Sequence, residues 1–534
     1  MSQFKEYKNL NLIDVAENVA EFWKANKTFE KSVETREGNP EFVFYEGPPS
    51  ANGMPGIHHV MARALKDIFC RYQTQNGKQV FRKAGWDTHG LPVELGVEKE
   101  LGITKEDIGK KISIEDYNKA CREAVMRYTD VWNHLTEKIG YWVDLEDPYI
   151  TYKSKYMETV WWLLKQLYSK DLLYKGYTIQ PYSPKAGTGL SSHEVNQPGA
   201  YRDVTDTTIV AQFKTLPETL PEFLKGFGDV HFLAWTTTPW TLPSNTALTV
   251  GPKIDYVLVK TFNQYTFEPI NIVLAKALVA KQFGKKFEFY DEDADDLLFS
   301  LNASNISKGD KIPYRILGEF KGADLVGIKY EQLLSYTLPY QNPENAFRVI
   351  SGDFVTTEDG TGIVHTAPTF GADDAKVAKE ASPEVPPMLV LNEFGNPVPL
   401  VDLQGKFTSQ MGDFAGKYVK NEYYDAGTAP EKSVDVEIAI RLKEENKAFK
   451  VEKYVHSYPH SWRTEEPLLY YPLDSWFVKM TAVKDRLVDL NKEINWKPKS
   501  TGEGRFGNWL ENVNDWNLSR SRYCGIPLPI WRTD

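Results

Sequence analysis

Two segments decide the fold of this chain: FVFYEGPPSANGMPGIHH at residues 42–59 and GWDTHGLPVE at residues 85–94. An apolar strand at 42–45 runs into a loop rich in proline and glycine, which ends in two histidines at the start of a periodic helix over 57–75. A short second strand at 79–82 leads into the other segment. Strand, helix and strand in this order predict a βαβ unit and a parallel, doubly wound sheet, so we expect an α/β fold.

The helix over 57–75 has apolar residues at helical spacing, which predict its buried stripe: Val60, Met61, Ala64, Leu65, Ile68, Phe69 and Tyr72. Similar patterns predict helices over 11–35, 114–139, 155–170 and 436–450. From about residue 201 to 425, short β-rich runs alternate with turns, which predicts a compact β-rich domain inserted into the first fold. The predicted domains are therefore 1–200, 201–425 and 426–534.

Composition narrows the class of protein. The chain has 534 residues, 41% of them hydrophobic and 25% charged, which fits a globular protein of two or three domains. No apolar run is long enough to span a membrane, and the N-terminus lacks the apolar region of a secretory signal. Three widely spaced cysteines fit a reducing cytoplasm. The net charge of −10 argues only weakly against a nucleic-acid partner, because a large acidic enzyme can still carry a local basic face.

The chemistry of the first segment suits an anion. Histidines and free amides at a helix N-terminus favour a phosphate, and Asp87 and His89 follow the second strand in a glycine-bounded loop. Neither the dinucleotide glycine fingerprint nor the phosphate loop that ends in Gly-Lys-Ser/Thr is present. Together the segments resemble the ATP and amino-acid loops of class I aminoacyl-tRNA synthetases, and GWDTHGLPVE resembles their isoleucyl branch. The resemblance implies a Rossmann-like parallel sheet with an inserted β-rich editing domain.

This resemblance also implies substrates and site residues. They are ATP with Mg²⁺, isoleucine and tRNA(Ile), with the isoleucine carboxylate attacking the α-phosphate in line. The family motif His-x-Gly-His reads Gly56-Ile57-His58-His59 here, so its first histidine and its glycine are exchanged. Either the loop backbone shifts to accommodate His58, or His58 takes over the missing phosphate contact. The implied catalytic residues are His59, His58 and Gly56; the ATP contacts are Asn52, Gly53 and His59; the isoleucine contacts are Pro48, Gly85, Asp87 and His89.

Residues 235–245 (WTTTPWTLPSN) and 360–374 (GTGIVHTAPTFGADD) are similar to the editing site of the isoleucyl, valyl and leucyl enzymes. One methylene separates valine from isoleucine, and isoleucyl enzymes are themselves the standard example of the ~1–3 kcal/mol that a hydrophobic pocket gains from it. Hydrolysis of mischarged valine is therefore implied. Asp374 would hold the amino group, and the other implied residues are Thr236, Thr237, Thr238, Trp240, Asn245 and His365.

Two departures from the family concern metal binding and pocket shape. Where some relatives carry zinc-binding cysteine pairs, this chain has Ser183, Ala186, Ser461 and Thr464, so we expect no zinc. We interpret His193, His456 and His460 as satisfied histidines rather than as a replacement zinc cluster. Cys524 stands where relatives have tryptophan near the amino-acid pocket, and we do not expect it to be a nucleophile.

A third departure is that the family's second ATP motif, Lys-Met-Ser-Lys-Ser, and a helical anticodon-binding domain do not occur in this sequence. We expect a piece truncated before that motif, monomeric, weak or inactive in activation and still able to hydrolyse Val-tRNA. Alternatives are a valyl enzyme, a stand-alone hydrolase of mischarged tRNA and a small-molecule nucleotidyltransferase. The second loop argues against the valyl enzyme, residues 201–425 alone support the hydrolase, and the nucleotidyltransferase leaves the insertion unexplained.

Overall fold

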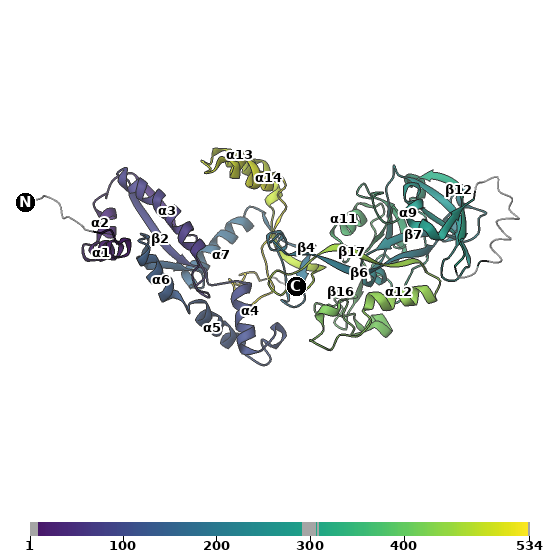
Figure 1. Ribbon diagram of the computed structural model, residues 1–534, viewed down its shortest axis with the longest axis horizontal. Coiled ribbons are helices and arrows are strands. Elements are labelled where there is room, and N and C mark those ends of the chain that lie inside the picture. Colours follow the sequence, from purple (N-terminus) through teal and green to yellow (C-terminus); the bar gives the residue numbers. More distant parts are fainter. Residues whose placement is uncertain (1–8, 291–305, 307–308, 532–534) are drawn as a thin grey trace, which may run out of the picture. The chain divides into compact units, whose positions relative to one another are not determined.

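The computed structural model describes residues 9–290, 306 and 309–531, and the chain divides into two compact units (Figure 1). Unit 1 comprises Met1–Tyr174 and Trp476–Asp534, and unit 2 comprises Lys175–Ser475. The chain passes from unit 1 into unit 2 along β4 (Leu173–Ser183) and returns along β18 (Leu469–Val478). Unit 2 is therefore an insertion into unit 1.

Unit 1 contains the predicted βαβ unit. Its sheet has the order β1 (Glu41–Tyr45), β2 (Gln79–Trp86) and β3 (Asp144–Ile150), and both pairings are parallel. Helix α3 (Ile57–Gln75) connects β1 to β2 and lies beside them (Figure 1). The parallel sheet and the α/β class predicted from the sequence are confirmed.

Two of the predicted helices are broken by local contacts. Instead of one helix over 11–35 there are α1 (Leu12–Ala25) and α2 (Thr28–Glu34), because Lys27 adopts the left-handed conformation with φ 48°. Instead of one helix over 114–139 there are α5 (Ile114–Val125) and α6 (Thr129–Lys138). At that break the Tyr128 amide donates to the Ala51 carbonyl at 3.0 Å, which ties α6 to the first loop.

The apolar stripe expected on α3 is not buried within the described structure, so this prediction is wrong. Met61, Ile68 and Tyr72 are 66%, 61% and 60% exposed, and Leu65 and Phe69 are exposed as well. The buried residues of α3 are instead Arg63, Cys70 and Thr74. Its buried positions contact both the sheet and α6: Thr74 Oγ1 accepts from Arg82 of β2 at 2.9 Å, and Arg63 donates to Thr136 Oγ1 of α6 at 2.7 Å.

Unit 2 is built on a ten-stranded sheet with the order β11-β12-β9-β10-β7-β14-β8-β13, to which β6 and β17 are added beside β7. Apolar residues of β6, β7, β8, β9 and β14 are buried in one core. The strands are β6 (Tyr201–Lys214), β7 (Val230–Thr236), β8 (Ala247–Val250), β9 (Asp255–Phe262), β10 (Pro269–Ala275), β11 (Phe287–Phe289), β12 (Ile312–Lys321), β13 (Arg348–Ser351), β14 (Ile363–Thr366) and β17 (Ala448–Pro459).

The helix expected over 436–450 ends early. Helix α12 spans Val434–Glu444, and Asn446 then adopts φ 53°, a left-handed conformation typical of helix ends. The chain from Ala448 continues as β17, which pairs antiparallel with β6 along its whole length (Figure 1). Because these two strands pair, the compact unit extends beyond the β-rich stretch at 201–425.

The remaining elements complete the two units. Within the described part of the chain, no helix is both long and apolar enough to cross a membrane. The elements are α4 (Leu91–Leu101), α7 (Ser154–Tyr168), α8 (Ser192–Val195), α9 (Val279–Phe283), α11 (Ala372–Glu380), α13 (Lys484–Glu493), α14 (Phe506–Glu511), β5 (Thr188–Gly189), β15 (Leu389–Leu391), β16 (Pro397–Pro399) and β19 (Trp516–Asn517).

A buried ion-pair cluster joins the two sequence segments of unit 1. The Glu94 carboxylate on α4 accepts hydrogen bonds from Arg522 Nε and, at 2.8 Å, from the Tyr523 amide. Arg522 also donates to Glu98 Oε1, which accepts from Tyr117 Oη at 3.0 Å. The side chains of Glu94 and Arg522 are 0% and 7% exposed, so both charges depend on each other for compensation.

We predict that Arg522→Met lowers the free energy of unfolding of unit 1 by about 3–5 kcal/mol, because two buried carboxylates lose their guanidinium partner. Urea unfolding followed by circular dichroism measures the change. Arg127→Met is the matched control, since its pair with Glu100 is exposed and contributes little. Equal destabilisation by the two substitutions would contradict the prediction.

Candidate functional site

The loop after β1 is anchored at its first residue. The Glu46 amide donates to the Lys83 carbonyl at 2.9 Å, and the buried Glu46 carboxylate accepts from Lys66 Nζ and Tyr141 Oη. Tyr149 Oη donates to the Glu46 carbonyl. The start of the proline- and glycine-rich loop is therefore fixed against β2, β3 and α3.

His59 is held in one tautomer at the first turn of α3. Its Nδ1 accepts from the Gly56 amide at 2.9 Å, and its ring packs edge-on against Trp132 at 4.7 Å. Burial, the neighbouring His58 and Arg63 together lower the pKa of His59. The ring is therefore neutral near pH 7 with its proton on Nε2, which has no hydrogen-bond partner within residues 9–290, 306 and 309–531.

The exchanged spelling of the motif has a steric explanation. The exposed His58 ring lies 3.8 Å from the His59 ring, and a Cβ built on Gly56 would stand 2.8 Å from His58 Cε1. The His58 ring thus occupies the space that a side chain at position 56 would need. Asn52 and Gly53 are exposed in the same loop, and the Gly53 carbonyl accepts from Trp132 Nε1 at 2.9 Å.

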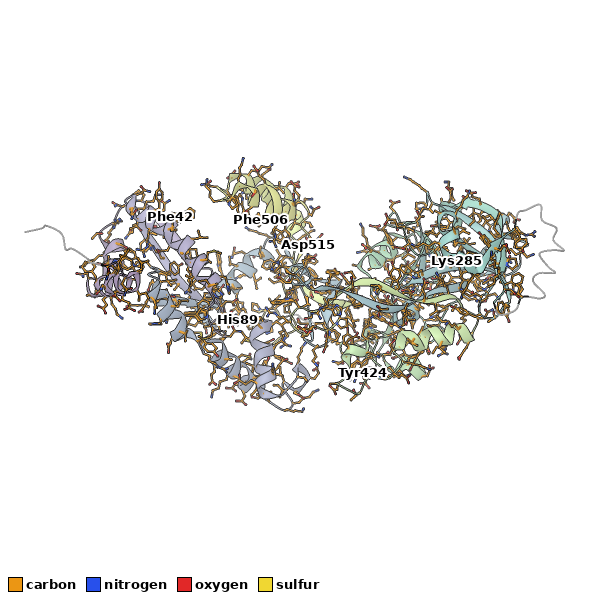
Figure 2. All side chains as sticks on the ribbon, in the orientation of Figure 1. Phe42, His89, Lys285, Tyr424, Phe506 and Asp515 are labelled. Carbon is orange, nitrogen blue, oxygen red and sulfur yellow. The ribbon has the colours of Figure 1, made fainter. Side chains whose placement is uncertain are left out.

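The second loop is tied to the first by a backbone hydrogen bond. The Asp87 amide donates to the Pro49 carbonyl at 3.0 Å, next to Pro48. Asp87 Oδ1 accepts from the His89 amide at 3.3 Å, and His89, labelled in Figure 2, has a pKa lowered by burial although Asp87 opposes the shift. A Cβ on Gly85 would stand 2.3 Å from the Tyr149 ring, so this position requires glycine. The structure therefore brings the predicted phosphate and amino-acid loops together.

Some residues of this site were not predicted from the sequence. Trp132 and Arg63 surround His59, with the Arg63 guanidinium 5.0 Å from the Trp132 ring centre. Trp132 lies on α6, far from the loop in sequence, and no local pattern distinguishes it from a core residue. The roles of Glu94 and Arg522 were missed as well, although two carboxylates four residues apart in α4 were a signal for a shared cation.

Cys524 lies beside the second loop without a reactive environment. Its carbonyl accepts from the Gly90 amide at 3.3 Å, and its buried thiol is 3.9 Å from the Thr88 carbonyl. The hydrogen bond that the Cys524 thiol donates to Cys121 and burial both raise the pKa of the Cys524 thiol. The thiol therefore stays protonated and acts as a small apolar group beside the second loop.

In unit 2, strand pairing brings the two predicted editing segments together. Strands β7 and β14 are parallel with Trp235 opposite Val364, so Thr236 and His365 follow on neighbouring strands at their carboxyl ends. The 3₁₀ helix η4 (Pro239–Ser244) follows β7, and α11 follows β14. Loops after the carboxyl ends of parallel strands are a common location for binding sites.

His365 is neutral, and both of its ring nitrogens form hydrogen bonds. Its Nδ1 accepts from Asn245 Nδ2 at 2.9 Å, and its Nε2 donates to Thr241 Oγ1 at 3.0 Å. The orientation of the Asn245 amide follows from its other contacts, a donation to the Ala247 carbonyl and an acceptance from Tyr330 Oη. Burial lowers the pKa of His365 to about 3. His365 therefore fixes Thr241 and Asn245 and is unsuited to acid–base catalysis near pH 7.

Asp374 has one free carboxylate oxygen. Its Oδ2 accepts from the Ala367 amide at 2.8 Å, whereas Oδ1 has no hydrogen-bond partner among the described residues. Gly371 leaves room for the carboxyl group, which would lie 2.7 Å from a Cβ at that position. Burial raises the pKa of Asp374 to about 6, against the opposing effect of the Ala367 amide. The free oxygen can accept a charge-assisted hydrogen bond from an ammonium group.

The threonines of this segment differ in the hydrogen bonds that their hydroxyl groups make. Thr236 Oγ1 accepts from the Thr238 amide at 3.1 Å, and Thr241 Oγ1 donates to the Thr238 carbonyl at 2.8 Å. The half-buried Thr237 hydroxyl has no hydrogen-bond partner within the part of the chain that the structure describes. Trp240 is buried, with its ring centre 5.0 Å from that of Phe370.

The four positions that correspond to zinc ligands form two turns closed by serine. Ser183 Oγ accepts from the Ala186 amide and Ser461 Oγ from the Thr464 amide, each at 3.2 Å. The three nearby histidines have separate partners: His193 contacts Gln197, His456 contacts Asp206, and His460 contacts the Tyr458 carbonyl. Among the residues described, no three His, Cys, Asp or Glu side chains converge as metal ligands would.

Comparisons with known proteins identify the family of the chain. A family model described as "tRNA synthetases class I (I, L, M and V)" matches residues 18–534. Isoleucine--tRNA ligase of Cytophaga hutchinsonii is 64% identical over 99% of this chain and 47% of its own length. The Bacteroides fragilis ligase of the same name is 60% identical over 100% of this chain and 46% of its own.

A solved structure titled "The crystal structure of GlLeuRS-CP1" aligns with 46% of this chain and 99% of its own, at 17% identity and a TM-score of 0.28. The chain spans about half the length of the curated relatives it matches. Since the family model covers nearly all of the sequence, the chain belongs to the class I tRNA synthetase family of the isoleucyl, leucyl, methionyl and valyl enzymes.

Proposed function

We propose that this chain is the catalytic and editing portion of an isoleucine–tRNA ligase, which activates isoleucine with ATP, transfers it to tRNA(Ile) and hydrolyses mischarged valine. The observation that carries the proposal is the hydrogen bond between the Asp87 amide and the Pro49 carbonyl, which joins an anion-binding loop to an acidic loop. The relatives at 60–64% identity are named for isoleucine, which favours it over valine as the substrate.

The first loop suits the phosphates of ATP. The His59 Nε2–H, the His58 ring and the free amides at the start of α3 supply donors for negative charge. A Cβ on Gly53 would meet no atom within 4 Å, so the space above this exposed glycine is open to a nucleotide. ATP with Mg²⁺ supplies the electrophilic α-phosphorus and the pyrophosphate leaving group.

The second loop suits the amino acid. The Asp87 carboxylate would pair with the isoleucine ammonium group, and Pro48, Gly85 and His89 would border the side chain. The isoleucine carboxylate then attacks the α-phosphorus, and the neutral His59 donates a hydrogen bond to the charge that develops there. The protein forms no covalent intermediate in this step.

Unit 1 exposes apolar surface at one edge of its sheet and on α3. Strand β1 is the edge of its sheet, with Val43 and Tyr45 exposed, and α3 exposes the apolar stripe described above. Apolar surface of this kind is stable when another element covers it. We infer that further strands of the catalytic sheet pack there in the complete ligase. The chain by itself then activates isoleucine weakly or not at all.

Unit 2 suits hydrolysis of the ester that joins valine to tRNA. Asp374 Oδ1 would hold the valine ammonium group, and the Thr237 hydroxyl and Thr238 would contact the substrate and orient water. The water oxygen attacks the ester carbonyl, the ribose oxygen leaves, and the water proton passes to that ribose oxygen. Valine and free tRNA are the products.

Paired assays separate this function from the alternatives. Isoleucine-dependent exchange of pyrophosphate into ATP is measured with the complete ligase, and deacylation of Val-tRNA(Ile) with this chain. Exchange that depends on valine would indicate a valyl enzyme. Deacylation without any amino-acid-dependent exchange would indicate a stand-alone hydrolase.

We predict that Asp374→Asn lowers the rate of Val-tRNA(Ile) deacylation about 100-fold, because the ammonium group loses its charged acceptor. Asp373→Asn is the matched control, since Asp373 is the exposed neighbour in the first turn of α11. Initial rates with labelled valine measure both. A normal rate in Asp374→Asn would remove Asp374 from the editing site.

The deacylation rate should rise with pH through about 6 and level off above it, because the raised pKa leaves Asp374 protonated and uncharged below that value. Initial rates between about pH 5 and pH 8 test this after subtraction of spontaneous hydrolysis. Asp435, whose pKa burial raises to about 7, is the other buried carboxyl to consider. The rise should therefore persist in Asp435→Asn; a flat profile would contradict the assignment.

For the phosphate loop, we predict that His58→Ala in the complete ligase lowers the kcat of isoleucine-dependent pyrophosphate exchange by about 100-fold, because one donor to the phosphates is lost. His134→Ala provides the control, since His134 is exposed on α6. Unchanged exchange in His58→Ala would show that the loop compensates through its backbone and not through His58.

A further inference from the structure

Unit 2 contains a buried charged cluster that the proposed hydrolysis does not use. We name it the Lys420 cluster: Asp206, Lys420, Asp435 and His456. Lys420 Nζ lies 3.0 Å from Asp206 Oδ2 and 3.9 Å from Asp435 Oδ2, and His456 Nε2 lies 3.1 Å from Asp206 Oδ2. The side chains of Lys420 and Asp435 are 7% and 6% exposed. Charges buried to this degree are costly unless each has a partner.

Asp435 uses its other oxygen on the backbone of the editing segment. Its Oδ1 accepts from the Trp240 amide at 2.8 Å. Trp240 is the second residue of η4, where helix geometry leaves amides without an internal acceptor, and the preceding Pro239 has no N–H. Asp435 thus satisfies the first free donor of η4.

The position of η4 in turn fixes the candidate editing residues. Thr241, in η4, donates to the Thr238 carbonyl and accepts from His365 Nε2. Asn245 ends η4 and donates to His365 Nδ1. A shift of the Trp240 amide would therefore move Thr238 and His365 together.

Lys420 compensates the two carboxylates of the cluster to different degrees. Lys420 is closer to Asp206, and burial alone would raise the pKa of Asp206, yet Lys420 keeps it lowered. Burial raises the pKa of Asp435 to about 7 because Lys420, at 3.9 Å, compensates it less completely. The interaction between Asp435 and the Trp240 amide therefore depends on the hydrogen-bond acceptor of Asp435 more than on a full negative charge. An asparagine retains such an acceptor.

We propose that Asp435 is a positioning residue of the editing site, which holds η4 through the Trp240 amide and thereby sets the places of Thr238 and His365. Lys420 compensates the buried carboxylates and has no direct part in positioning η4. The inference rests on the proposed deacylation of Val-tRNA(Ile) by unit 2.

The test compares three variants of this chain in Val-tRNA(Ile) deacylation. Asp435→Leu removes the acceptor and should lower kcat about 100-fold, as a displaced positioning contact does, with KM unchanged. Asp435→Asn keeps an acceptor and should retain the wild-type kcat. Asp435→Leu combined with Lys420→Met and Asp206→Asn leaves none of these three positions with an uncompensated buried charge, so it should melt like the wild type and still be slow.

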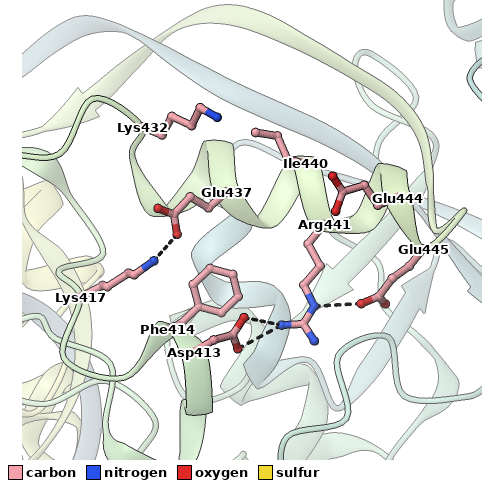
Figure 3. A pocket seen from close by; sticks show the side chains of 9 residues that line it. All are labelled: Asp413, Phe414, Lys417, Lys432, Glu437, Ile440, Arg441, Glu444 and Glu445. Carbon is pink, nitrogen blue, oxygen red and sulfur yellow. Dashed lines mark hydrogen bonds and ion pairs between the residues drawn. The ribbon is translucent and has the colours of Figure 1, made fainter.

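Asp413→Leu is the matched control. The Asp413 carboxylate lies 3.0 Å from the guanidinium group of Arg441, which belongs to α12, as Asp435 does. Asp413 and Arg441 line an open hollow of about 520 Å³ (Figure 3). The substitution removes an acidic contact to α12, but among the described residues Asp413 contacts nothing in η4. It should therefore leave kcat and KM unchanged.

The possible outcomes are distinct. A wild-type kcat in Asp435→Leu, or a kcat restored by the added Lys420→Met and Asp206→Asn, would overturn the positioning role and leave only charge compensation. A loss in Asp435→Asn equal to that in Asp435→Leu would overturn it as well. If the unmodified chain does not deacylate Val-tRNA(Ile), or Asp374→Ala has no effect, the proposed editing function itself fails and the positioning role fails with it.

Discussion

Parallel pairing of two neighbouring strands places the loops that follow them side by side, and both candidate sites depend on this constraint. In unit 1 the loops after β1 and β2 meet, and the Asp87 amide bonds the Pro49 carbonyl. In unit 2 the segments after β7 and β14 meet, and Thr241 bonds His365. Each site thus combines residues that are far apart in sequence with backbone rigidity that comes from the sheet.

Within each site, polar groups divide into neutral donors and charged acceptors. Burial keeps His59 and His365 neutral, and a hydrogen bond to Nδ1 places the proton of each on Nε2. Their chemical difference lies in what Nε2 meets, since that of His365 is taken by Thr241, whereas that of His59 is available. The charged acceptor in each site is a carboxylate, Asp87 in unit 1 and Asp374 in unit 2. One oxygen of each accepts a hydrogen bond from a backbone amide.

Buried charges join distant segments in both units. The Glu94 carboxylate binds Arg522 and the backbone after it, so the last part of the chain is tied to the helix that follows the acidic loop. The Lys420 cluster has a similar place in unit 2, where Asp435 binds the backbone of η4. In each case a carboxylate satisfies backbone amides and a cation compensates its charge, which makes the contact both strong and directional.

The sequence by itself predicted the βαβ unit, the β-rich insertion and the segments that meet in both candidate sites, because these depend on local periodicity and on short segments with distinctive spacing. It failed on α3, whose apolar stripe is exposed while Arg63 is buried, since periodicity identifies an apolar face but not what covers it. It also missed the break at Asn446, where pairing of β17 with β6 ends a helical pattern.

Only the tertiary structure decided how the site residues are used. It showed that the His58 ring fills the space left by Gly56, that His365 is engaged at both nitrogens, and that Asp374 keeps one oxygen free. These properties depend on burial and on partners far away in the chain. The type of each residue is known from the sequence. Its protonation state and its unused hydrogen-bonding groups depend on the atoms packed around it.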